Sequence, residues 1–160
     1  MINLENYFDI TLTVKTKSQA KEQDLAIVIV MDISNTMVTN YVEGTTTRLA
    51  AAISAGENLI NDFATYSSGV TATRKIGYVA FNTHANQIFA LSDCKTETTA
   101  TNLINTVKTE TSNIIGTDYG SSDDRYTNIE GGLQMAHDML YTGEGASIQN
   151  KYIIILSDGF

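Results

Sequence analysis

Oxygen-bearing side chains at five positions are the most chemically suggestive feature of this sequence. Asp32, Ser34 and Thr36 alternate with other residues directly after an apolar run, and Thr127 and Asp158 occur much later in the chain. These side chains offer carboxylate and hydroxyl oxygens, with no thiol or imidazole nearby. Such a donor set suits a hard cation such as Mg²⁺. The residue types therefore indicate a divalent cation site, provided that the fold brings the three segments together.

Two apolar runs are the elements that must position these residues. The first, over residues 25–31, ends at Asp32, and the second, over residues 151–156, ends just before Asp158. Unbroken runs rich in Val and Ile are typical of strands that are buried in parallel sheets. Because open α/β sheets bind ligands just beyond the carboxyl ends of their strands, both aspartates stand where a site is expected.

The remaining pattern predicts a doubly wound α/β fold. Apolar residues at helical spacing predict helices over residues 45–66, 98–115 and 129–140, and the threonines at 45–47 offer N-caps for the first. Residues 75–81 and 87–91 read as strands that form an antiparallel hairpin, and 8–15 as a half-buried strand. Helices alternating with buried strands predict helices on both faces of a mostly parallel sheet. In this fold Asp32, Thr127 and Asp158 reach the same edge.

Composition limits the partners. The chain has 160 residues and a formal net charge of −8, which argues against nucleic acid or an anionic membrane surface as the main partner. A single cysteine excludes an intrachain disulfide, and no apolar stretch approaches the ~20 residues of a membrane span. We therefore expect no membrane insertion.

The three motifs together resemble the von Willebrand factor type A domain with a metal-ion-dependent adhesion site. The family pattern is Asp-x-Ser-x-Ser after the first strand, a threonine in a second loop and Asp-Gly after the fourth strand. Asp32, Ser34 and Thr36 fill the first motif, Thr127 the second and Asp158 the third. Thr36 keeps the hydroxyl of the usual serine. Asn35 stands where the family often has Gly, and Asn tolerates positive φ.

The resemblance implies a mode of binding. Ser34, Thr36 and Thr127 are expected to approach Mg²⁺ (or Mn²⁺ or Ca²⁺) directly. Asp32 and Asp158 are expected to ligate it directly or through water. A carboxylate of a protein or matrix ligand then completes the coordination. The implied function is metal-dependent adhesion without catalysis, at the cell surface or outside the cell, with Gram-positive surface and pilus tip adhesins as the nearest likeness.

The resemblance also implies a domain division. Residues 1–23 are expected to form an N-terminal strand and linker, and residues 24–160 an incomplete domain with a Rossmann-like sheet of order 3-2-1-4 and one antiparallel edge strand. The last strands and helices of the family are missing from this sequence. The strand over residues 151–156 is then an exposed edge, which invites self-association.

Two other functions remain open at this stage. Aspartate-nucleophile phosphotransferases also place a buried strand before Asp-x-Asp-x-Thr, which Asp32 and Thr36 match, but Ser34 replaces the acid/base aspartate. An intracellular assembly subunit with the same type A domain, as in chelatase or ATPase-linked complexes, is a second alternative, so a cytoplasmic location also stays open.

Overall fold

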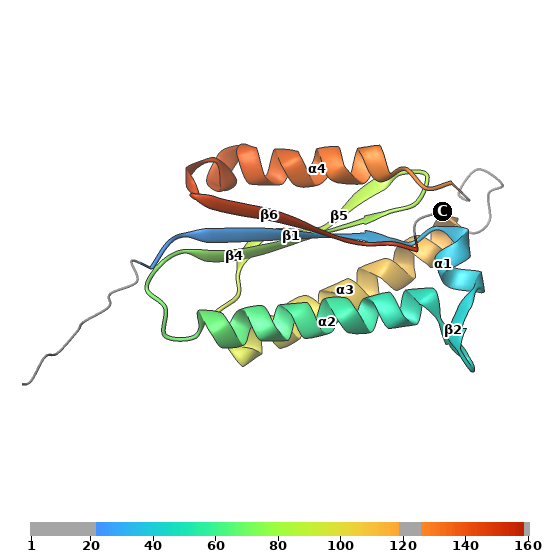
Figure 1. The fold of residues 1–160 in the computed structure, drawn as a ribbon. Coiled ribbons are helices and arrows are strands. Elements are labelled where there is room, and N and C mark those ends of the chain that lie inside the picture. Colours follow the sequence, from blue (N-terminus) through green and yellow to red (C-terminus); the bar gives the residue numbers. More distant parts are fainter. Residues whose placement is uncertain (1–21, 119–125, 159–160) are drawn as a thin grey trace, which may run out of the picture.

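A four-stranded sheet between two layers of helices forms the body of the protein (Figure 1). The computed structural model describes residues 22–118 and 126–158. The sheet has the order β5-β4-β1-β6. Its strands are β1 (Leu25–Asp32), β4 (Arg74–Phe81), β5 (Ala85–Asp93) and β6 (Asn150–Leu156). The parallel strands β4 and β6 flank β1, and β5 pairs antiparallel with β4. The predicted fold class and hairpin are confirmed.

Strand β1 is central because both of its faces are apolar. Ile29 and Met31 point into one core cluster, and Val28 and Val30 point into the other. All four side chains are fully buried. Alternation of a strand's side chains between two covered faces explains the unbroken apolar run that marked this segment in the sequence. Asp32 is therefore the last residue of a strand that is buried on both faces.

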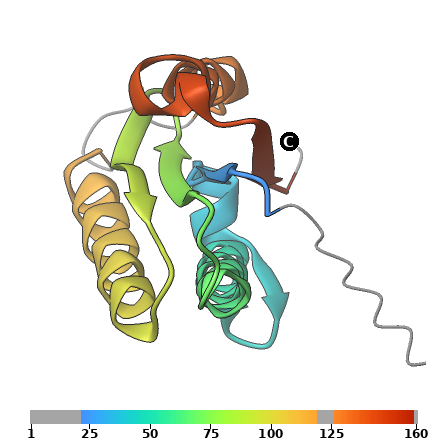
Figure 2. The same cartoon turned by 90° about the vertical axis from the view of Figure 1, so that its left-hand side faces the viewer.

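Three long helices cover the two faces. Helices α2 (Arg48–Ser67) and α3 (Glu97–Asp118) lie on one face, and α4 (Ile129–Tyr141) lies on the other (Figure 2). A Cβ added at Gly132 of α4 would stand 2.8 Å from the ring of Phe81, so this glycine lets the helix lie close against the sheet. Ile129, which we expected on the apolar face of this helix, is instead 42% exposed. It is the first residue of α4.

The segment between β1 and α2 differs from the prediction. It contains a short helix, α1 (Asn35–Thr39), and a two-stranded hairpin of β2 (Tyr41–Glu43) and β3 (Thr46–Thr47). The predicted helix over residues 45–66 therefore begins later, and Thr47 is its N-cap, accepting a hydrogen bond from the Ala50 N–H at 3.1 Å. Glycine at position 44 has a φ of +56°, which a tight hairpin turn requires and other residues rarely adopt. The sequence analysis missed this hairpin because its strands are too short to show a period.

Strand β6 is an edge strand and not fully buried. It pairs with β1 alone, and Tyr152 and Ile155 are 56% and 43% exposed. A short 3₁₀ helix, η1 (Gly143–Ser147), precedes it. The prediction of a buried interior strand was thus wrong for the described residues, while the prediction of an exposed edge is confirmed. The expected N-terminal strand over residues 8–15 lies outside the described residues.

Candidate metal centre

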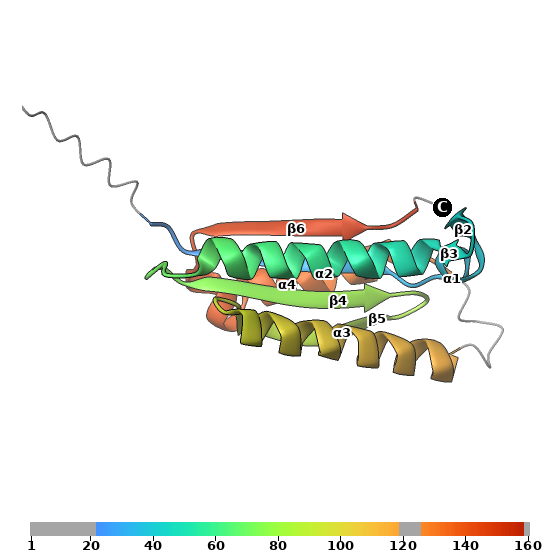
Figure 3. The ribbon, with the colours of Figure 1, turned by 90° about the horizontal axis from the view of Figure 1, so that it is seen from below.

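The polar residues of the first and third motifs meet at the carboxyl ends of β1 and β6. These ends lie at the same side of the molecule as α1 and the β2–β3 hairpin (Figure 3). Asp32 is the last residue of β1, and Asp158 follows β6 by two positions. The parallel register between the two strands, with Met31 opposite Leu156, brings residues 126 positions apart to one edge.

Asp32 is fully buried, and each of its two carboxylate oxygens accepts a hydrogen bond. One of its carboxylate oxygens accepts a hydrogen bond from the Ser34 backbone N–H at 2.8 Å, and the other accepts one from the Ser157 hydroxyl at 2.8 Å. The first bond closes the turn that follows β1, and the second ties β6 to it. Both oxygens are satisfied by protein donors, so Asp32 organises the hydroxyl-bearing residues around it.

Ser34 occupies the N-cap position of α1 but does not cap the helix with its side chain. Its hydroxyl lies 3.2 Å from that of Thr36, and Ser34 is only 1% exposed. The hydroxyl of an N-cap serine normally accepts a hydrogen bond from the first turn of its helix. The Ser34 hydroxyl instead contacts that of Thr36. Asn35, the first residue of α1, needs no positive φ: no described residue other than glycine has one.

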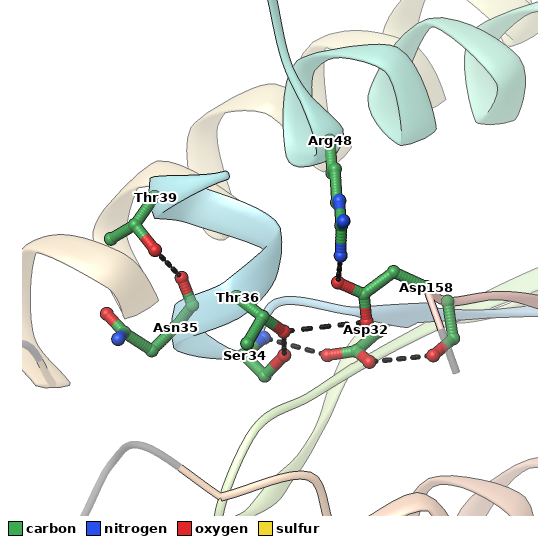
Figure 4. Close-up of polar contacts among 8 residues, drawn as sticks. Asp32, Ser34, Asn35, Thr36, Thr39, Arg48 and Asp158 are labelled. Carbon is green, nitrogen blue, oxygen red and sulfur yellow. Dashed lines mark hydrogen bonds and ion pairs between the residues drawn. The ribbon is translucent and has the colours of Figure 1, made fainter. Parts of the chain in front are cut away.

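Asp158 completes the cluster (Figure 4). Its Oδ1 lies 3.5 Å from the Thr36 hydroxyl, which points toward it, and its Oδ2 lies 2.5 Å from a guanidinium nitrogen of Arg48. The side chain of Asp158 is 8% exposed and that of Arg48 is 30% exposed. Sequence analysis did not single out Arg48, which lies within the predicted helix over residues 45–66.

The second motif reaches the same edge through β4. The Phe81 carbonyl accepts a hydrogen bond from the Ile33 N–H at 2.8 Å, and the next carbonyl, of Asn82, accepts one from the Asn128 N–H at 2.7 Å. Asn128 is the N-cap of α4 and follows Thr127 directly. Consecutive carbonyls at the end of β4, those of Phe81 and Asn82, thus hold the turn after β1 and the start of α4. The half-buried Thr127 lies at this edge, and its role as a ligand stays a prediction.

The oxygen atoms of Ser34, Thr36 and Asp158 fit a hard cation in type and spacing. The Thr36 hydroxyl lies 3.2 Å from that of Ser34 and 3.5 Å from Asp158 Oδ1. Neighbouring ligand oxygens around an octahedral ion with bonds of ~2.1 Å are about 3.0 Å apart, so both distances are slightly longer than the Mg²⁺ spacing. Within the described residues, no group of three or more His, Cys, Asp or Glu side chains could hold a metal. Any site here therefore depends on hydroxyls supported by two carboxylates.

Comparison with known proteins decides the family. The family model of the von Willebrand factor type A domain matches residues 27–160. The chain belongs to the von Willebrand factor type A family. The match begins in β1 and includes every motif residue named above. No sequence among curated proteins matches the chain significantly.

Three pilus proteins are among the solved structures with the same fold. The vWF domain of the type V pili tip protein Mfa5 from Porphyromonas gingivalis is 20% identical, with a TM-score of 0.59 over 88% of this chain and 39% of that one. The PilB minor pilin from Streptococcus sanguinis is 22% identical, with a TM-score of 0.62 over 88% and 31%. The pilus adhesin SpaC from Lactobacillus rhamnosus GG is 18% identical, with a TM-score of 0.59 over 89% and 16%.

These likenesses show a shared type A fold. This chain spans well under half the length of these three proteins. In residues 22–118 and 126–158, no helix is both long enough and apolar enough to cross a membrane.

Proposed function

We propose that this type A domain is a metal-dependent adhesion module, which binds an acidic residue of a protein or matrix ligand through a divalent cation. The observation that carries the proposal is the single hydrogen-bonded cluster formed by Asp32, Ser34, Thr36 and Asp158. These four oxygen-bearing residues come from two distant segments and meet at the edge where α/β sheets bind ligands. Their convergence there supports a shared role in binding.

Each residue has a distinct part in this proposal. The hydroxyls of Ser34 and Thr36, with that of Thr127, face the cation, and Asp158 supports it through Oδ1. Asp32 acts indirectly, because its two oxygens already hold the Ser34 backbone and the Ser157 hydroxyl. Mg²⁺, or Mn²⁺ or Ca²⁺ in its place, supplies a Lewis-acidic position for an incoming carboxylate. A site with few directly bound carboxylates keeps the cation attractive to one more.

The same geometry favours binding over phosphotransfer. A nucleophilic aspartate needs a free oxygen directed at the substrate, whereas both oxygens of Asp32 accept hydrogen bonds from within the domain. We therefore expect no turnover of 4-nitrophenyl phosphate or acetyl phosphate in the presence of Mg²⁺. Turnover that disappears in Asp32→Asn would establish the phosphotransferase alternative instead.

The pilus proteins with this fold support a role at the cell surface. Mfa5 is described as a pili tip protein, PilB as a minor pilin and SpaC as a pilus adhesin. We propose the same setting for this chain, with surface adhesion preferred over the intracellular assembly role. Self-association through β6 stays a prediction, which rests on the exposure of Tyr152 and Ile155.

Titration calorimetry with Mn²⁺ and Mg²⁺ tests the metal site. We expect the wild-type chain to bind one ion, and Ser34→Ala and Asp158→Ala to bind at least tenfold more weakly, since each loses an oxygen at the ion. Asp93→Ala, at the far end of β5, is the control because its side chain is 69% exposed. The absence of metal binding by the folded wild type would refute the proposal.

A further inference from the structure

The Arg48 side chain is the feature of this site that the family motif does not account for. Its guanidinium pairs with Asp158 Oδ2 at 2.5 Å, and its side chain retains 30% exposure. A permanent cation beside a proposed divalent cation site is electrostatically unfavourable for the metal. The position of Arg48 beside Asp158 therefore calls for an explanation other than support of metal binding.

Both the backbone and the side chain of Arg48 are held by specific contacts. Its backbone N–H donates to the Asn40 carbonyl at 2.9 Å, across the base of the β2–β3 hairpin. Thr47 caps α2, so Arg48 is the first residue of that helix. From there the side chain extends to the cluster of Asp32, Ser34 and Asp158 (Figure 4). The arginine thus comes from a third segment, outside the three motifs.

The two oxygens of Asp158 are divided between two tasks. Oδ1 faces the hydroxyl of Thr36, and Oδ2 faces Arg48. Arg48 can therefore keep its ion pair while Oδ1 supports a cation. The guanidinium also remains partly exposed at the rim, where an arriving group can reach it.

A count of charges shows what the arginine changes. The hydrogen bonds and the ion pair of the cluster bring together two carboxylates, of Asp32 and Asp158, and one guanidinium. A divalent cation neutralises the two carboxylates. With Arg48, the loaded cluster carries one surplus positive charge, whereas without Arg48 it is neutral. One surplus positive charge is matched by one carboxylate from a partner.

We propose that Arg48 determines the specificity of the loaded site for an anionic ligand group. It weakens the hold on the divalent cation and strengthens the hold on the partner's carboxylate, through its charge at the rim of the site. The proposal rests on the metal-dependent function above, and it assigns to Arg48 a role that is separate from metal ligation. It predicts opposite effects of one substitution on the two binding steps.

The first measurement uses Mn²⁺ alone. Arg48→Gln removes the charge, Arg48→Lys keeps it, and Arg74→Gln is the matched control. Arg74 lies at the start of β4, at the opposite end of the sheet, where its guanidinium contacts the Gln23 carbonyl. We expect Arg48→Gln to bind Mn²⁺ about fivefold more tightly than the wild type, because a like charge has been removed. Arg48→Lys and Arg74→Gln should stay within about twofold of the wild type.

The second measurement uses acetate as the carboxylate probe. Protein-bound Mn²⁺ accelerates the ¹³C relaxation of acetate that reaches its coordination sphere, so a titration of carboxyl-labelled acetate gives the acetate affinity of the loaded site. We expect acetate to bind about fivefold more weakly to Mn²⁺-loaded Arg48→Gln than to the loaded wild type, because the surplus charge is gone. Circular dichroism and thermal unfolding of each variant verify that it is folded.

The outcomes separate the two proposals. Tighter Mn²⁺ binding with weaker acetate binding in Arg48→Gln supports the role of Arg48. Binding of Mn²⁺ by the wild type with unchanged acetate affinity in Arg48→Gln overturns that role alone. Weaker Mn²⁺ binding in Arg48→Gln, restored in Arg48→Lys, also overturns it and makes Arg48 a support for Asp158. If the folded wild type binds no Mn²⁺, both proposals fail.

Discussion

The two aspartates of the candidate metal centre are held by very different parts of the sheet. Asp32 ends β1, which has a strand on either side, and it is fully buried. Asp158 follows β6, an edge strand with β1 as its neighbour, and its Oδ2 pairs with Arg48, whose side chain is 30% exposed. One half of the site is therefore part of the core, and the other half lies against it.

This difference indicates that the β1 half and the β6 half of the site have different roles. The β1 half sets the geometry of the hydroxyls, because moving Asp32 would disturb two hydrogen bonds and the core beneath them. The β6 half can adjust by small amounts at less cost, since β6 is an edge strand that pairs with β1, whereas β1 has a strand on either side. A cation that draws together the oxygens of Ser34, Thr36 and Asp158 should therefore move Asp158 toward the two hydroxyls and leave the turn after β1 in place.

The largest expected contrast comes from the same substitution in the two strands. Ile29→Ala in β1 removes a fully buried side chain and should lower the free energy of unfolding by about 3–4 kcal/mol. Ile155→Ala in β6, where the side chain is 43% exposed, should cost about 1 kcal/mol or less. Urea unfolding followed by circular dichroism measures both. Equal losses would show that β6 is buried as deeply as β1 and would remove the basis of the comparison.

The second contrast compares the aspartates themselves in metal-free protein. Asp32→Ala leaves the buried Ser34 N–H without its acceptor and should destabilise the protein by about 2–3 kcal/mol. Asp158→Ala removes the long hydrogen bond from Thr36 and an ion pair whose arginine is 30% exposed, and it should cost about 1 kcal/mol. Thermal unfolding in the presence of a chelator gives the two values. A larger loss for Asp158 would place the rigid half of the site on β6.

The third prediction concerns the contact that joins the two halves. Ser157→Ala removes the hydrogen bond from the Ser157 hydroxyl to Asp32 Oδ2 and should cost about 1 kcal/mol. In Asp32→Ala the same change should cost close to nothing, since the acceptor is already gone. A double-mutant cycle by urea unfolding measures this coupling. Additive effects would mean that the hydrogen bond does not couple the two turns in solution.

The smallest effect is expected at the other end of β6. Lys75 donates a hydrogen bond to Glu144 of η1 at 2.8 Å, and this contact lowers the pKa of Glu144 below its ordinary value of 4.5. A lowered folded pKa stabilises the protein above pH 4.5, and the contribution is lost as the pH falls through the folded value. Glu144→Gln should therefore be slightly less stable than the wild type at pH 7.

At pH 3 this difference should shrink, because the unfolded chain takes up a proton at Glu144 below its ordinary pKa of 4.5, and the advantage of the ionised folded form declines. Glu110→Gln, at an exposed position of α3, is the control for a loss of negative charge. Urea midpoints at the two pH values provide the comparison. A difference that persists unchanged at pH 3 would contradict a role for the ionised carboxylate.

Much of the fold could be predicted because its strongest elements carry a clear period. The apolar run of β1 and the helical spacing in α2 and α4 predicted these elements within a few residues of their observed bounds. The exposed edge of β6 followed from its place in the expected strand order. The hairpin β2–β3 and helix α1 were missed because segments of two to five residues are too short for a pattern.

The candidate site shows the same limit. Asp32, Ser34 and Thr36 could be grouped from their spacing, and the parallel strand order brought Asp158 to them. Arg48 could not be found in this way, because its proximity to Asp158 depends on the path of the missed hairpin. A lone arginine at the start of a helix carries no signal of its own in a sequence.

Anomalous diffraction from a crystal soaked in Mn²⁺ tests the central claim most directly, because it locates the ion. We predict one strong peak within about 2.2 Å of the hydroxyl oxygens of Ser34 and Thr36. The peak should lie on the side of Asp158 Oδ1, with Arg48 still paired to Oδ2. A fully occupied peak elsewhere on the molecule, with no peak at these oxygens, would contradict the account.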